Sequence, residues 1–126
     1  GQAPLNSQEV CMSCNTNNGI FNKDLYGRCG DKRLPLTFTF KDSNGDILDI
    51  SQYKFFIELK GTSNVLYQIG NGLSIVDNKL IWDFGNKLTL APDTYTYGIK
   101  IVDNINQPTT IIQGNFYVSE EIVRVQ

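Results

Sequence analysis

The sequence predicts an all-β domain, and three features of its pattern support that prediction. From Leu34 onward, apolar and polar residues alternate in several short runs, which is the period-2 pattern of half-buried strands. Strong turn sequences separate these runs, and counting them gives about seven or eight strands at a spacing of roughly 8–12 residues. No amphipathic helical pattern is visible. Strands with one apolar face each are typical of two antiparallel sheets that pack into a β-sandwich.

Residues 1–33 differ in composition from the rest of the chain. They are rich in Asn, Gly, Ser and Gln, carry all three cysteines, and show neither helical nor strand periodicity. We therefore divide the chain into an extended N-terminal arm, 1–33, and a β-sandwich domain, 34–126. The arm is more apolar than a solvating tail needs, which favours docking on a neighbouring subunit over a disordered tail. Its candidate partner-binding residues are Val10, Met12, Ile20, Phe21, Leu25 and Tyr26.

Four runs of the sandwich domain alternate most clearly, at residues 34–41, 53–60, 79–84 and 94–102. One face of each run carries large apolar side chains, which predicts that this face points into the core. These residues are Leu36, Phe38, Phe40, Tyr53, Phe55, Ile57, Leu59, Leu80, Trp82, Phe84, Tyr95, Tyr97, Ile99 and Ile101. Phe56 and Tyr117 fall on the opposite faces of their strands. Since interfaces are enriched in aromatic residues, both are candidate partner-binding residues.

The turn sequence DSNGD at 42–46 joins the first two of these runs. It contains Asn44-Gly45, a dipeptide favoured where both central turn residues need positive φ. With Asp49, its aspartates resemble part of a calcium-binding loop. The remaining oxygen ligands and the closing Glu are missing, so we predict a polar hairpin turn.

Composition and charge lower the odds of several classes of function. A net charge of -2 without a basic cluster gives no attraction to nucleic acid or to an anionic membrane. No apolar run approaches the roughly 20 residues of a membrane span, and the first residues lack the pattern of a secretory signal. Gly1 in place of Met indicates removal of the initiator Met or cleavage of a longer precursor. Histidine is absent, which removes the commonest general base near neutral pH, so we expect no enzyme and no cofactor.

The cysteines have the spacing Cys11-x-x-Cys14 followed by Cys29. Thiolates at the first spacing can share a zinc ion, and Cys29 could add a third ligand. A fourth Cys or His does not exist, so Asp24, Asp31 or water would have to complete the site. Free thiols, or one disulfide from Cys29 to Cys11 or Cys14, are favoured over metal.

Three motifs of the sandwich domain together resemble the pattern of a known protein family. The residues Asp42, Gly45, Asp49 and Ile50 match a "D-x-x-G-x-x-x-D-[LI]" hairpin that leads into an aromatic strand. The matches continue with Leu90, Pro92, Tyr95, Tyr97 and Ile99, and then with Gly114, Phe116, Val118, Ile122 and Arg124. This pattern is similar to small Ig-like β-domains of tailed-bacteriophage virion proteins, including the amino-terminal domain of baseplate upper proteins. The chain departs from it at Asp93, Gly98 and Val123.

The resemblance implies an Ig-like fold and a structural role without catalysis. Members of this family serve as adaptors, decoration or fibre attachment, and they hold virion subunits together in several copies. The implied partners are other virion proteins of the head, neck, tail or baseplate, and the implied location is the virion, assembled in the host cytoplasm. A tyrosine corner at Tyr95 and Tyr97 would fit the same fold. An extracellular carbohydrate-binding β-sandwich is the alternative function, and it requires aromatic rings exposed on one sheet.

Overall fold

The computed structural model describes residues 7–11, 21–42, 44–102 and 108–120. Ten strands occur in this part of the chain, and none of these residues is helical, so no helix of the described ranges could cross a membrane. The strands are β1 (Ser7–Cys11), β2 (Phe21–Asn22), β3 (Leu25–Arg28), β4 (Leu36–Lys41), β5 (Lys54–Lys60), β6 (Asn64–Ile69), β7 (Gly72–Val76), β8 (Lys79–Trp82), β9 (Asp93–Val102) and β10 (Pro108–Ser119). The prediction of an all-β fold is confirmed.

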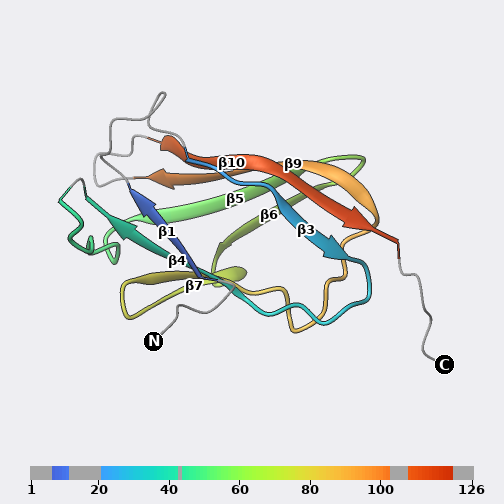
Figure 1. The fold of residues 1–126 in the computed structure, drawn as a ribbon, viewed down its shortest axis with the longest axis horizontal. Coiled ribbons are helices and arrows are strands. Elements are labelled where there is room, and N and C mark those ends of the chain that lie inside the picture. Colours follow the sequence, from blue (N-terminus) through green and yellow to red (C-terminus); the bar gives the residue numbers. More distant parts are fainter. Residues whose placement is uncertain (1–6, 12–20, 43, 103–107, 121–126) are drawn as a thin grey trace.

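The ten strands form one hydrogen-bonded sheet that curls back on itself. The strand order is β1-β4-β8-β7-β6-β5-β9-β10-β2, and β3 also pairs with β10. β6 and β7 pair over two residues, and at this short contact we divide the sheet into a β4 half (β1, β4, β8 and β7) and a β9 half (β6, β5, β9, β10, β2 and β3). Figure 1 shows β4 and β7 on one side of the molecule and β5, β9 and β10 on the other.

The sheet is mixed, whereas a purely antiparallel sandwich was expected. β1 runs parallel to β4, and β2 and β3 run parallel to β10. These three pairs come from residues 1–33, and a fourth parallel pair joins β6 to β7 over two residues. The strands of residues 1–33 were missed because they are only two to five residues long. The Ig-like assignment stays a prediction.

Residues 1–33 contribute strands to both edges of the chain's own sheet. β1 lies beside β4 at one edge, and β2 and β3 lie beside β10 at the other. Val10 and Leu25 are 2% and 5% exposed, so these side chains belong to the core of their own chain. This placement corrects the prediction that Val10 and Leu25 face a partner. The docking of residues 1–33 on a neighbouring subunit stays a prediction.

Aromatic contacts between the two halves build the core. The Trp82 ring of β8 lies 6.0 Å from the Tyr97 ring of β9 and 6.0 Å from the Phe116 ring of β10. At the other end, the Phe40 ring of β4 stacks on Phe55 of β5 at 5.6 Å. Because both inner faces are apolar, their contact removes these rings from water and holds the halves together.

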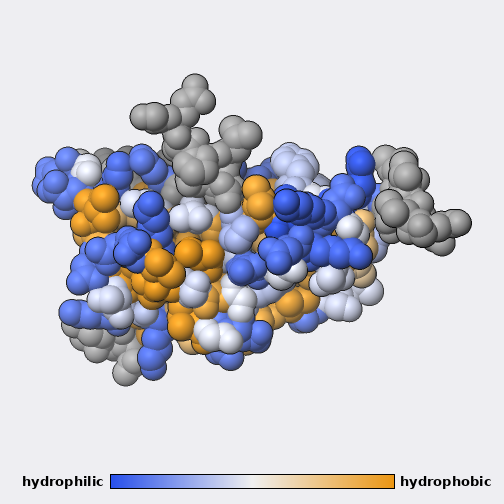
Figure 2. All heavy atoms as spheres, turned by 90° about the horizontal axis from the view of Figure 1, so that it is seen from below, coloured by the Kyte–Doolittle hydropathy of each residue, from blue (hydrophilic) through white to orange (hydrophobic). Residues whose placement is uncertain are grey.

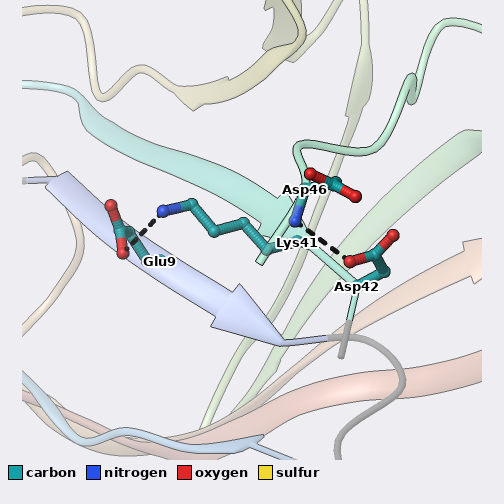
Figure 3. A network of polar contacts seen from close by, with 4 residues as sticks. All are labelled: Glu9, Lys41, Asp42 and Asp46. Carbon is teal, nitrogen blue, oxygen red and sulfur yellow. Dashed lines mark hydrogen bonds and ion pairs between the residues drawn. The ribbon is translucent and has the colours of Figure 1, made fainter. Parts of the chain in front are cut away.

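The Asn44-Gly45 turn differs from the predicted type. Gly45 has a φ of 87°, but Asn44 is not among the described residues with positive φ. The Asp42 carboxylate instead accepts hydrogen bonds from the backbone N–H of Asn44 at 2.9 Å and from that of Asp46 at 3.0 Å. Figure 3 shows the second of these bonds. This carboxylate therefore orders the turn. The turn with two positive-φ residues lies at Asp77-Asn78, between β7 and β8.

The turn before β9 is tied by a tyrosine. The Tyr95 hydroxyl donates a hydrogen bond of 2.7 Å to the Ala91 carbonyl, four residues upstream. The Tyr97 hydroxyl donates to the Lys23 carbonyl, which attaches the segment between β2 and β3 to β9. Both rings are buried. The Tyr95 bond has the short upstream reach of a tyrosine corner, whereas the Tyr97 bond joins residues that are 74 positions apart.

Candidate functional site

A groove on the outer face of the β9 half is the candidate site, and strand alternation determines which residues reach it. The odd-numbered residues of β5 and β9 are mostly buried, so the even-numbered ones point outward. Register places these outward residues in rows across β5, β9 and β10. The rows are Phe56–Lys100–Thr110, Glu58–Gly98–Gln113 and Lys60–Thr96–Asn115.

Gly98 and an irregularity in β10 create the hollow in this face. The register between β9 and β10 shifts between Thr110 and Ile112, which marks a β-bulge. A Cβ placed on Gly98 would meet nothing closer than 3.9 Å, the distance to the Ile112 carbonyl oxygen. The missing side chain therefore leaves open space in the middle row, between Glu58 and Gln113.

The groove has a volume of about 510 Å³ and a mixed lining. Strands β5, β6, β9 and β10 all contribute to it. Its lining residues are Phe56, Glu58, Lys60, Leu66, Thr96, Tyr97, Gly98, Lys100, Val102, Pro108, Thr110 and Gln113. Phe56 is half-buried and Leu66 is 49% exposed, so the groove presents apolar surface to water. Such a surface is stabilised when an apolar group covers it.

The outer face of the β9 half carries excess positive charge although the chain as a whole is acidic. Lys54, Lys60 and Lys100 point outward from β5 and β9, and Glu58 is the carboxylate among them. The Lys60 ammonium lies 3.7 Å from the Glu58 carboxylate. Lys100 takes part in neither of the two ion pairs found among the described residues. The groove therefore offers a cation to an anionic partner.

The predicted partner-binding residues fall into three groups. Phe56 lines the groove, as its position opposite the apolar face of β5 suggested. Tyr26 and Tyr117 lie together on β3 and β10, where their rings stack at 5.1 Å and Tyr26 is 66% exposed. Met12, Ile20 and the side chain of Phe21 lie outside the described part of the chain. The partner-binding role of these six residues stays a prediction.

Arg33 holds the Tyr26 strand against the core. Its guanidinium donates a hydrogen bond of 2.6 Å to the Tyr26 carbonyl oxygen and lies 5.4 Å from the Phe84 ring and 5.5 Å from the Phe116 ring. Burial lowers the pKa of Arg33. The cation therefore fixes the edge strand next to the tyrosine pair, and its contacts indicate a structural role.

The structure does not assemble a metal site from the cysteines that it describes. Cys29 is a free thiol, half-buried after β3, while Cys11 lies on β1 with an undescribed side chain. Cys14 falls outside the described ranges. Within those ranges, no three Cys, Asp or Glu side chains gather in a way that could hold a metal ion. The choice between thiol, disulfide and zinc stays a prediction.

Sequence reasoning missed most of the groove. Lys60, Leu66 and Lys100 gave no signal, because surface lysines and single exposed leucines occur on every β-domain. Gly98 did give one, since a glycine inside a strand often marks a bulge or a close approach of another group. Only the pairing of β5, β9 and β10 brings these residues together.

Comparisons with known proteins give a structural similarity and no match in sequence. No protein-family model matches the sequence, and no curated protein matches it. Among solved structures, the chain is similar to the N-terminal domain of phage TP901-1 ORF48, with 10% sequence identity and a TM-score of 0.38. The similarity covers 90% of this chain and 98% of that one.

Proposed function

We propose that this chain is a structural component of a tailed-phage virion and binds neighbouring virion subunits without catalysing a reaction. The groove on the β9 half is the observation that carries the proposal. It combines exposed apolar surface with Lys100, which forms no ion pair within the described part of the chain. A surface of this kind loses water and gains an ion pair when a partner covers it.

The sequence resemblance to phage Ig-like domains supports the same role. Its matching residues build the framework: Asp42 orders a turn, Tyr95 ties the turn before β9, and Phe116 packs on Trp82. A sheet held by such residues is a stable carrier for a docking surface. The role is that of an adaptor, a decoration protein or a fibre-attachment module, present in several copies. Assembly in the reducing bacterial cytoplasm would keep Cys29 a free thiol.

The test is the presence of the chain in purified particles. Particles of the phage that encodes the chain are separated from the host lysate on a density gradient, and their peptides are identified and counted by mass spectrometry. We expect the chain in the particle fraction, at a copy number that matches a symmetric part of the virion. Recovery in the soluble lysate alone would contradict the proposal.

A carbohydrate-binding module is the second candidate, and exposed rings favour it. Phe56, Tyr26 and Tyr117 all have accessible ring surface on the outer face of the β9 half. Aromatic rings on one sheet face can stack on sugar rings. A glycan array separates the two functions: binding to a defined glycan would favour the module, and an empty array favours the virion role.

A further inference from the structure

We propose that the groove receives an extended segment of a neighbouring subunit in which two acidic residues flank an aliphatic one, in the pattern acid-x-aliphatic-x-acid. This inference rests on the proposed function, since it takes the groove as the docking surface. It adds the chemistry and the spacing of the partner, which follow from three adjacent rows of the β9 half.

The row spacing sets the spacing of the partner. Lys100 stands in the first row and Lys60 in the third, with Gly98 in the row between them. Two rows correspond to four residues along a strand, or roughly 13 Å at about 3.3 Å per residue. An extended segment that runs along β9 repeats at the same rise. Residue i of the partner would therefore face Lys100 and residue i+2 would face Gly98. Residue i+4 would face Thr96, with Lys60 beside it on β5.

Charge selects acidic residues at the two outer positions. Lys100 has no ion-pair partner among the described residues, and the contact between Lys60 and Glu58 is 3.7 Å long. A carboxylate at each end would pair the free ammonium of Lys100 and add a second anion beside Lys60. Since the whole chain carries a net charge of -2, this positive face is local, which favours recognition of a segment by its charge.

The open space above Gly98 selects an aliphatic side chain at the central position. A Cβ on Gly98 would find its nearest atoms at 3.9 Å and 4.0 Å, so the hollow can take a side chain from outside. Phe56 and the half-exposed Leu66 supply apolar surface in the lining of the same groove. A leucine or isoleucine there would bury surface that water now covers.

A saccharide fits this groove less well than a peptide segment. Phe56 is the one aromatic ring of its lining that points outward, because the ring of Tyr97 is buried. The remaining outward rings, Tyr26 and Tyr117, stack on each other at 5.1 Å and do not line the groove. Sugar recognition needs free ring faces, whereas a peptide needs the charges and the hollow.

The test uses an end-capped peptide, Ser-Glu-Ser-Leu-Ser-Glu-Ser, titrated into the isotope-labelled chain at low ionic strength and followed by amide NMR shifts. We expect saturable shifts confined to residues 56–60, 96–102 and 110–113, and we expect added salt to weaken them. A peptide with lysine in place of both glutamates should give no shifts, and one with serine in place of leucine should bind about tenfold more weakly. No saturable shift at millimolar peptide, or shifts elsewhere, would overturn the proposal.

Variants of the chain make the test specific. Gly98→Val fills the hollow with a side chain that the strand can accommodate, so we expect the NMR spectrum to keep its dispersion while peptide affinity falls at least about tenfold. Lys100→Glu should weaken binding by a similar factor. Lys79→Glu makes the same charge change at an exposed position of β8, on the other half. We expect it to change peptide affinity less than about twofold. Unchanged binding by Gly98→Val would overturn the proposal.

The outcomes separate this inference from the virion role. If the chain is found in particles but the peptide does not bind, the inference fails and the virion role stands. If the peptide binds and the chain is absent from particles, the virion role fails and the groove remains a peptide-binding site. Displacement of the peptide by a glycan would assign the groove to carbohydrate and overturn the inference.

Discussion

The two halves of the sheet have similar inner faces and different outer faces. On the inside, Phe38 and Trp82 of the β4 half face Tyr97 and Phe116 of the β9 half, and all four are buried. On the outside, the β9 half has a groove, while the face seen from the side of β4 and β7 gathers hydrophobic residues in a patch with hydrophilic residues around it (Figure 2). Period-2 alternation therefore fixes the inner faces and leaves each outer face free to differ.

Each half has one ion pair among the described residues, and the halves differ in the cation that lies beside the groove. On the β4 half, the Lys41 ammonium of β4 lies 3.2 Å from the Glu9 carboxylate of edge strand β1 (Figure 3). On the β9 half, the Lys60 ammonium lies 3.7 Å from the Glu58 carboxylate, while Lys100 in the groove has no ion-pair partner among the described residues. A cation that is paired within its own chain contributes little to recognition, whereas an unpaired one next to a hollow is available to a partner.

The largest expected effect is the loss of the core that both halves share. Trp82→Ala removes a fully buried ring that contacts Tyr97 and Phe116, and we expect it to lower the free energy of unfolding by about 3–5 kcal/mol. Ile81→Ala, at the neighbouring half-buried position on the outer face, should cost about 1 kcal/mol. Denaturant unfolding measures both. Similar costs for the two variants would mean that the inner face does not join the halves.

Two glycines of the β9 half should respond to alanine in opposite directions. At Gly114 a Cβ would lie 2.1 Å from the Lys23 carbonyl oxygen, so Gly114→Ala must push the segment between β2 and β3 away, at a cost of about 2 kcal/mol. Gly98→Ala enters open space and should add about 0.5 kcal/mol of stability. Thermal unfolding of both variants is the measurement. Destabilisation by Gly98→Ala would show that the hollow is filled in the folded chain.

A single hydroxyl at the start of β9 should have an intermediate effect. Tyr95→Phe keeps the buried ring and removes the hydrogen bond to the Ala91 carbonyl, so we expect a loss of about 1 kcal/mol. Tyr53→Phe is the control, because no hydrogen bond of this hydroxyl is found among the described residues. Equal stability of Tyr95→Phe and the wild-type chain in urea would show that this hydrogen bond does not stabilise the fold.

High pH should weaken the attachment of the β2–β3 segment to the β9 half. Burial, followed by the charge of Asp24, raises the pKa of Tyr97 above its ordinary value. The protonated hydroxyl is therefore favoured in the folded state, and its contribution is complete below about pH 10 and falls as the pH rises through the folded-state pKa. Urea midpoints measured from pH 8 to 11 should decline less in Tyr97→Phe than in the wild-type chain. An identical decline of the urea midpoint in both proteins would contradict a raised pKa of Tyr97 in the folded state.

The smallest expected effect is at the edge of the β4 half. Glu9→Gln removes the ion pair with Lys41, whose side chains are 68% and 30% exposed, so the loss of stability should stay below about 1 kcal/mol. Hydrogen exchange at the amides of β1 reports the local change, and 0.5 M salt should reproduce it in the wild-type chain. A loss of several kcal/mol would show that the pair, rather than the burial of Val10, holds β1 in place.

Alternation predicted the inner faces well because burial acts residue by residue. Phe38, Ile57, Trp82 and Ile99 are all 2% exposed or less, as their spacing indicated. The edge strands β1, β2 and β3 escaped prediction because their order comes from parallel pairing with distant strands. The groove could not be predicted from the sequence for a related reason. Its rows depend on the register of three strands and on a bulge, and neither property is local in sequence.

The central claim is that the β9 half, and not the β4 half, faces the neighbouring subunit. Lysine acetylation, compared by mass spectrometry between the isolated chain and assembled particles, tests it most directly. We predict that Lys60 and Lys100 lose reactivity on assembly, while Lys79 on the outer side of β8 keeps it. Protection of Lys79 with full reactivity of Lys100 would contradict the account.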